Sequence, residues 1–138
     1  MFVRRIVLVL LILFCSVGLA QAEWKKLIDS PTFGGLNVYV EPTSVRIDKG
    51  SGLVKMWILY DYKTGQEGFQ VRYLSMKIQR QYDCKQERSR MLAQSLFGGN
   101  MAKGDVIFTE STAGTWIPVG PGTIGRSLWN AACGTVKP

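Results

Sequence analysis

The sequence predicts an α+β fold, in which a single antiparallel sheet of about six strands carries a C-terminal helix on one face. Three observations lead to this prediction. Apolar and polar residues alternate with a period of two, as in strands, in several segments between positions 36 and 109. Glycine is frequent (15 residues) and proline is not (5 residues), as expected where tight turns join short strands. The segment 123–133 instead has a helical period.

The first 22 residues have the three parts of a secretory signal peptide. Arg4 and Arg5 provide a positive start, an apolar run follows, and Ala20-Gln21-Ala22 provides a small-residue cleavage site. The apolar run Ile6–Leu19 is 14 residues long, whereas a membrane-spanning helix needs about 20. We therefore expect cleavage after residue 22, export to the periplasm or the cell surface, and no stable membrane span afterwards.

The mature domain, residues 23–138, keeps two cysteines, Cys84 and Cys133. Two cysteines in an exported chain of this size most simply form one disulfide. A redox role is the alternative, but the chain has no Cys-x-x-Cys motif. The remaining cysteine, Cys15, lies in the predicted signal peptide, where the bulky Phe14 before it disfavours a lipid anchor.

Three segments have the clearest strand patterns. Leu36–Val40 places three apolar residues on one face, and Leu53–Tyr62 is rich in aromatic and branched residues on both sides, as a central strand would be. A polar loop is expected over 63–70, because it contains two glycines. Tyr73–Cys84 alternates again, with Cys84 on its apolar face.

Further strands complete the sheet. Over 89–97 we expect a strand whose odd-numbered side chains share a face, although a helix over 86–96 is compatible with propensity alone. Short extended segments are expected over 106–109 and at an edge over 116–119, which contains a proline.

The predicted helix begins after Thr123, a good N-cap residue, and runs to about Cys133. At 100° per residue its apolar side chains share about half of the cylinder, and Cys133 borders that half. A disulfide to Cys84 would therefore hold the helix against the apolar face of the sheet.

Several segments, in their order along the mature chain, carry a family resemblance. They are Val38-Tyr39-Val40-Glu41-Pro42-Thr43-Ser44-Val45, Val54 to Lys63, Tyr82-Asp83-Cys84, Arg88-Ser89-Arg90, Gly99-Asn100-Met101 with Gly104, Trp116-Ile117-Pro118-Val119, and Leu128-Trp129 with Cys133. Together they resemble the surface-adhesin protein E family of bacteria. The resemblance implies an antiparallel sheet with a C-terminal helix held by a disulfide. It also implies a surface protein that binds host matrix proteins such as vitronectin and laminin.

Five basic residues fall within 14 positions and form the candidate ligand-binding patch: Lys77, Arg80, Lys85, Arg88 and Arg90. Such a patch would suit an extracellular-matrix protein or an anionic envelope polysaccharide. The alternative is a solvated hairpin whose charges keep the sheet soluble and its edges unpaired.

Other chemistry is disfavoured. The chain has no histidine, which excludes Ser-His-Asp and Cys-His nucleophile systems and histidine-ligated zinc. Asp61 and Asp83 could act as paired carboxylates, but no spacing rule brings them together. The sequence contains no recognisable metal-ligand cluster or phosphate-binding loop. We therefore expect neither a cofactor nor enzymatic activity.

The expected function is that of an exported, non-enzymatic, adhesin-like binding module. The alternative is a periplasmic structural or envelope-associated protein with no host ligand. Nucleic acid is disfavoured, because the exported domain would have 15 basic and 10 acidic residues, a net charge of only +5. An exposed sheet edge would permit a homodimer.

Overall fold

The computed structural model of the chain describes residues 22–134. The predicted signal peptide therefore lies outside the described residues, apart from Ala22. The elements are, in chain order, β1 (Lys25–Ser30), the 3-10 turn η1 (Thr32–Gly34), β2 (Leu36–Val40), the 3-10 turn η2 (Pro42–Ser44), β3 (Arg46–Ile47), β4 (Val54–Gly68), β5 (Val71–Asp83), β6 (Arg88–Phe97), β7 (Val106–Glu110), β8 (Ile117–Pro118) and α2 (Ile124–Cys133).

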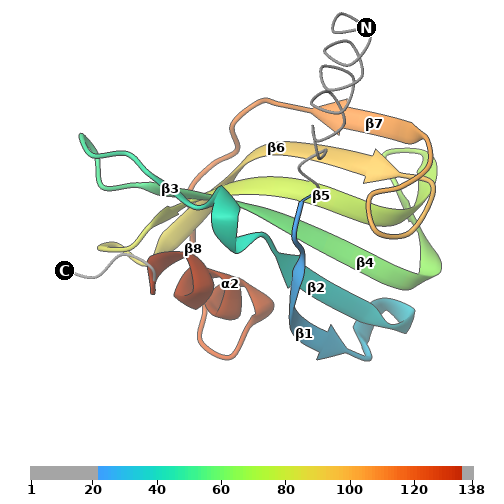
Figure 1. The fold of residues 1–138 in the computed structure, drawn as a ribbon, viewed down its shortest axis with the longest axis horizontal. Coiled ribbons are helices and arrows are strands. Elements are labelled where there is room, and N and C mark those ends of the chain that lie inside the picture. The colour runs from blue at the N-terminus through green and yellow to red at the C-terminus, as the bar shows by residue number, and fades with distance from the viewer. Residues whose placement is uncertain (1–21, 135–138) are drawn as a thin grey trace, which may run out of the picture.

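The main path of the sheet has the strand order β1-β2-β4-β5-β6-β7, and every pair along it is antiparallel (Figure 1). The two-residue strands β3 and β8 pair with β4 and β6. The prediction of about six strands is too low, because these two short strands bring the sheet to eight within residues 22–134. β1 and β7 end the main path, and a homodimer through such an edge stays a prediction.

The predicted alternation of β2 is confirmed by burial. In β2 the three apolar side chains on one face are at most 5% exposed. In β4, Val54, Met56 and Ile58 are at most 1% exposed, whereas Tyr60 on the same face is half-buried. One buried cluster joins them to residues of β5 and α2: Leu36, Val38, Val40, Val54, Met56, Ile58, Tyr62, Tyr82, Leu128, Ala132 and Cys133. Because α2 contributes to the same cluster, burial of apolar area couples the helix to the strands.

The β4–β5 hairpin is longer than the sequence predicts. The segment 63–70 is not a loop: β4 continues to Gly68, and only Phe69 and Gln70 make the turn, both with positive φ (53° and 62°). The pairing is irregular between Asp61 and Gln66. Beyond this irregularity the strand is rich in polar residues and glycine, and this composition is also that of a loop.

Residues 88–97 form a strand, as predicted in preference to a helix. The prediction that all odd-numbered side chains of this strand share one face is wrong. The ladder between β5 and β6 shifts at Leu92, which has no opposite residue. A bulge of this kind sends the following side chains to the other face. Ser89 before the bulge is buried, whereas after it the buried residues are Gln94 and Leu96.

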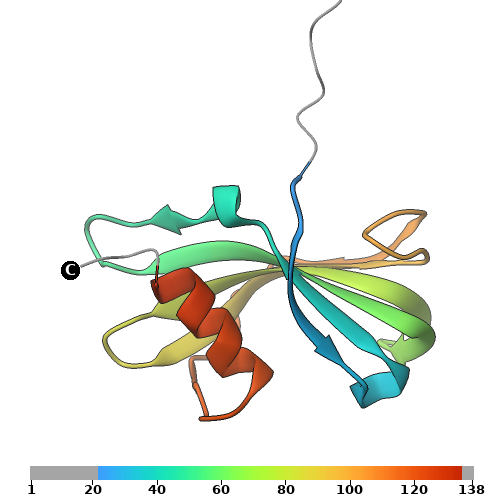
Figure 2. The same ribbon diagram turned by 60° about the horizontal axis from the view of Figure 1, so that its bottom comes forward.

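α2 lies beneath one end of the sheet (Figure 2). The predicted cap is confirmed, because the Thr123 side-chain oxygen accepts a hydrogen bond of 3.1 Å from the backbone N–H of Arg126. No helix within residues 22–134 is long and apolar enough to cross a bilayer.

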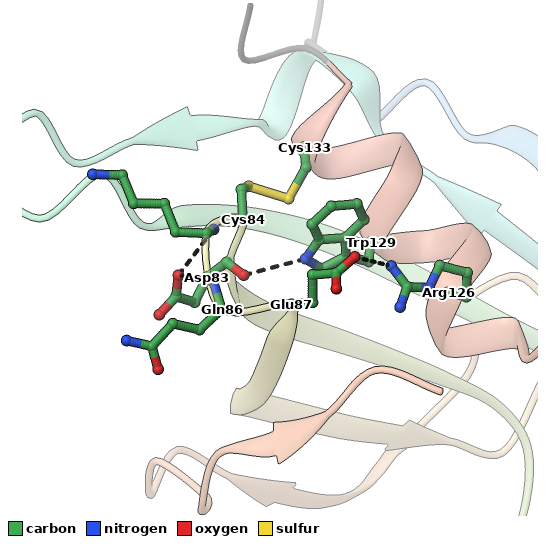
Figure 3. The surroundings of a disulfide bond; sticks show 8 residues. Asp83, Cys84, Gln86, Glu87, Arg126, Trp129 and Cys133 are labelled. Carbon is green, nitrogen blue, oxygen red and sulfur yellow. Dashed lines mark hydrogen bonds and ion pairs between the residues drawn. A yellow bond between two sulfur atoms is a disulfide. The ribbon is translucent and has the colours of Figure 1, made fainter. Parts of the chain in front are cut away.

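The β5–β6 turn and α2 are joined by a disulfide between Cys84 and Cys133, which are 49 positions apart (Figure 3). The Trp129 indole N–H donates a hydrogen bond of 3.2 Å to the backbone carbonyl of Asp83. An ion pair of 2.8 Å between the Arg126 guanidinium and the Glu87 carboxylate adds a third link. The predicted disulfide is thus one of three links between the turn and the helix.

Candidate functional site

The sheet has two faces with different chemistry, and they divide the predicted basic patch. We call the face with the buried cluster the helix face, and the opposite one the outer face. Directly opposed residues of antiparallel strands point to the same face. Arg80 lies opposite the buried Met56 and so belongs to the helix face. Lys77 is three positions from Arg80 along β5, so its side chain points to the opposite face. Arg90 and Arg88 lie opposite Gln81 and Asp83, whose side chains point to the same face as Lys77. Lys77, Arg88 and Arg90 therefore share the outer face.

Lys77 is held against two tryptophan rings of the outer face. Its ammonium lies 4.6 Å from the centre of the Trp57 ring and 5.9 Å from that of Trp24. Trp24 comes from the segment before β1, which crosses the sheet in Figure 1. Such cation–π contacts favour a cation over the ring face.

Two arginines of β6 share one further tryptophan. The Cζ atoms of Arg88 and Arg90 lie 4.7 Å and 4.6 Å from the ring centre of Trp116. Arg90 also donates a hydrogen bond of 2.8 Å to the Gln81 side chain. Lys85 stands apart from them, exposed in the β5–β6 turn. The five predicted residues therefore do not form one patch, and three of them lie among aromatic rings.

Other strands add cations to the outer face. Across four neighbouring strands, Arg46, Lys55, Gln81 and Arg90 lie opposite one another in one row. Neighbouring strands are about 4.8 Å apart, so this row presents three cations along roughly 14 Å. The outer face thus has a line of three cations, of which only Arg90 lies in the sequence window 77–90.

Asp83 neutralises part of this charge. One of its carboxylate oxygens accepts backbone hydrogen bonds from Lys85 (3.1 Å) and Gln86 (3.0 Å), and the other pairs with Arg88 at 3.1 Å. Burial pushes the pKa of Asp83 up, but the hydrogen bonds from Gln86, Arg88 and Lys85 outweigh it, so the pKa lies below its ordinary value.

Asp83 should therefore make folding sensitive to acid. A lowered pKa gives stability that is fully present above the ordinary carboxyl pKa and is lost as pH falls through the folded-state value. We expect Asp83→Asn to lower the free energy of unfolding by about 1 kcal/mol at neutral pH and by less in acid. Urea denaturation at both pH values measures this, with the exposed Asp105→Asn as the control. An equal loss at both pH values would contradict the ionic role.

Asp61 does not meet Asp83. It lies opposite Ser75, eight positions from Asp83 along β5, which corresponds to roughly 26 Å. Its carboxylate accepts hydrogen bonds from the Asn100 side chain (3.0 Å) and the Met101 backbone (2.8 Å), so it holds the loop before β7. Within residues 22–134, no group of three or more Cys, Asp or Glu residues is arranged to hold a metal ion.

The outer face therefore combines several cations and tryptophans with the engaged carboxylates of Asp61 and Asp83 and with the exposed Asp29, which lies in the row of Asp61. A model of the surface-adhesin protein E family matches residues 24–134, which span all of this geometry. The chain belongs to this family. It is accordingly an adhesin-like binding protein.

Solved structures of Haemophilus influenzae protein E have the same fold as this family member. Crystal form II is 10% identical, with a TM-score of 0.62 over 84% of this chain and 91% of that one. Another structure of the protein gives 10% identity and a TM-score of 0.61 over 84% and 87%. The protein from a non-typeable strain gives 13% and 0.54 over 84% and 76%. No curated protein sequence matches the chain significantly.

Sequence reasoning about this adhesin-family chain missed the outer-face residues that lie far from the window 77–90. Arg46, Lys55 and Trp116 join it only through strand pairing and the approach of the segment before β8. The available signal was the alternation of β4, which places Lys55 and Trp57 on the same side.

Proposed function

We propose that the chain is an exported, adhesin-like module that acts by binding, and that its outer face binds a polyanionic chain such as a matrix glycosaminoglycan. The observation that carries the proposal is the set of cations seated on tryptophan rings. Lys77, Arg88 and Arg90 all have this arrangement, and ring contacts reduce their freedom before any ligand arrives.

The charges of the outer face also suit an extended ligand. The row through Arg46, Lys55 and Arg90 runs across the strands, and Lys77 lies in another row. A polyanion laid across the sheet would meet several cations at once, while a single small anion would meet one.

Neutralising three outer-face cations tests the proposal. We expect the triple variant Lys55→Gln, Lys77→Gln and Arg90→Gln to bind immobilised heparin at least about tenfold more weakly, because close charge pairs contribute much of such affinity. The binding of the unmodified protein should weaken as salt rises, since salt screens exposed charges. Surface plasmon resonance over a salt series measures both effects.

A charge-matched control separates this face from net charge. Lys49, Arg72 and Lys103 are exposed cations outside the outer-face rows, and their triple change to Gln removes the same charge. The control should bind heparin within about twofold of the unmodified protein. An equal loss in both variants, or binding that ignores salt, would overturn the proposed surface.

Export to the cell surface is the second part of the proposal, and it is supported by the sequence of residues 1–22 and by the family. Protease treatment of intact cells should remove the protein if it is displayed. Recovery from the periplasm alone, with no binding to matrix protein or heparin, would instead give it the role of an envelope-associated protein without a host ligand.

A further inference from the structure

A second candidate site lies on the helix face, where a cavity of about 280 Å³, open to solvent on one side, lies between the sheet and the start of α2. Residues of β4, β5, β6, β8, the segment between β8 and α2, and the first half of α2 line it. This site is independent of the outer face.

Arg80 brings a positive charge to this cavity. Its guanidinium donates a hydrogen bond of 3.0 Å to the Ser89 hydroxyl. Within residues 22–134 no carboxylate lies within 4.0 Å of it, whereas Arg88 and Arg126 each have a carboxylate partner. A half-buried guanidinium without a counter-ion is disfavoured, so the cavity is suited to an anion.

Two tyrosines add hydroxyl donors. Tyr82 is 1% exposed and lines the cavity, and within residues 22–134 its buried hydroxyl has no hydrogen-bond partner. A buried hydroxyl normally has a partner, so a ligand oxygen that reached this one would supply the missing hydrogen bond. Burial raises the pKa of Tyr60 and of Tyr82, and the charge of Arg80 only partly opposes this. Both hydroxyls therefore keep their protons near neutral pH and can donate.

The rest of the lining limits the size and character of the ligand. Thr123 and Gly125 place the N-terminal end of α2, with its partial positive charge, at the cavity. Ile117, Val119 and Leu128 form apolar walls. One fixed cation with neutral donors matches a single negative charge, and the planar guanidinium matches the two oxygens of a carboxylate.

We propose that this cavity binds the carboxylate of a short organic acid, with the carboxylate on Arg80 and Tyr82 and the apolar stem between β8 and α2. The same carboxylate chemistry is offered by a free short-chain acid and by an acidic side chain of a polypeptide. The cavity volume, below that of a typical drug-sized site, fits a group of this size.

Titration of the full mature protein with butyrate and with N-acetyl-glutamate N-methylamide, followed by NMR, tests the proposal. Butyramide, which lacks the charge, is the matched ligand. We expect saturable shifts of cavity residues with at least one of the two acids and none with butyramide. Saturation by butyrate identifies a free acid as the ligand class, and saturation by the blocked glutamate only identifies an acidic side chain.

Two variants show whether the named groups do the binding. Arg80→Gln should weaken the acid at least about tenfold, and Tyr82→Phe, which keeps the ring, should weaken it by a smaller factor. Arg72→Gln, an exposed arginine outside both proposed binding sites, is the matched control and should leave this affinity unchanged. Absence of saturation by either acid at millimolar concentration, or equal binding to folded Arg80→Gln, would overturn the proposal.

Discussion

Replacing both Cys84 and Cys133 with serine is expected to lower the free energy of unfolding by about 4 kcal/mol. The bond closes a loop of 49 positions, and the chain-entropy estimate for a loop of that length gives this value. Small domains are stable by only about 5–15 kcal/mol, so the loss would be a large share of the total. Urea denaturation of the oxidised protein and the double variant measures it.

Local opening should accompany this loss. The hydrogen bond from Trp129 to Asp83 and the ion pair of Arg126 with Glu87 join the same two segments, and without the disulfide they must hold α2 by themselves. Amide exchange in α2 should therefore rise more than in β4. Reduction of the unmodified protein is the control and should reproduce the variant. A change below about 1 kcal/mol, or unchanged exchange in α2, would contradict this account.

Leu128→Ala is expected to cost about 3 kcal/mol. Leu128 is 1% exposed and belongs to the cluster that includes Met56 and Tyr82. Its removal would leave a cavity between α2 and the sheet, and leucine-to-alanine changes at such sites cost about 2–5 kcal/mol. Thermal and urea unfolding measure the change.

Leu27→Ala provides the same substitution at a site that is 38% exposed in β1. It should cost no more than about 0.5 kcal/mol. Equal losses for Leu27→Ala and Leu128→Ala would mean that burial against α2 contributes little.

Sequence patterns predicted the fold best where one face of a strand is buried. In β2, three alternating apolar residues fixed which side faces the core, and the helix showed its own period and its cap at Thr123. They failed where the backbone leaves the regular ladder. The bulge at Leu92 reverses the alternation of β6, and no residue type in that stretch marks it.

The binding surface was harder to predict, because neighbours in sequence alternate between faces. The window that suggested one patch places Arg80 on the opposite side from Lys77, and it places Lys85 in a turn. Conversely, Lys55 and Trp116 reach the outer face through register and chain path, which a single sequence does not encode in a local pattern.

The four tryptophans provide the most direct test of where the polyanion binds. Trp24, Trp57 and Trp116 lie against outer-face cations, whereas the indole of Trp129 is hydrogen-bonded to Asp83 beside the disulfide. The measurement is the NMR signal of each indole N–H in isotope-labelled protein during titration with a short heparin oligosaccharide. We predict that the three outer-face signals shift together and that the Trp129 signal stays in place. A shift confined to Trp129, or no shift at saturating heparin, would contradict the assignment of the outer face as the binding surface.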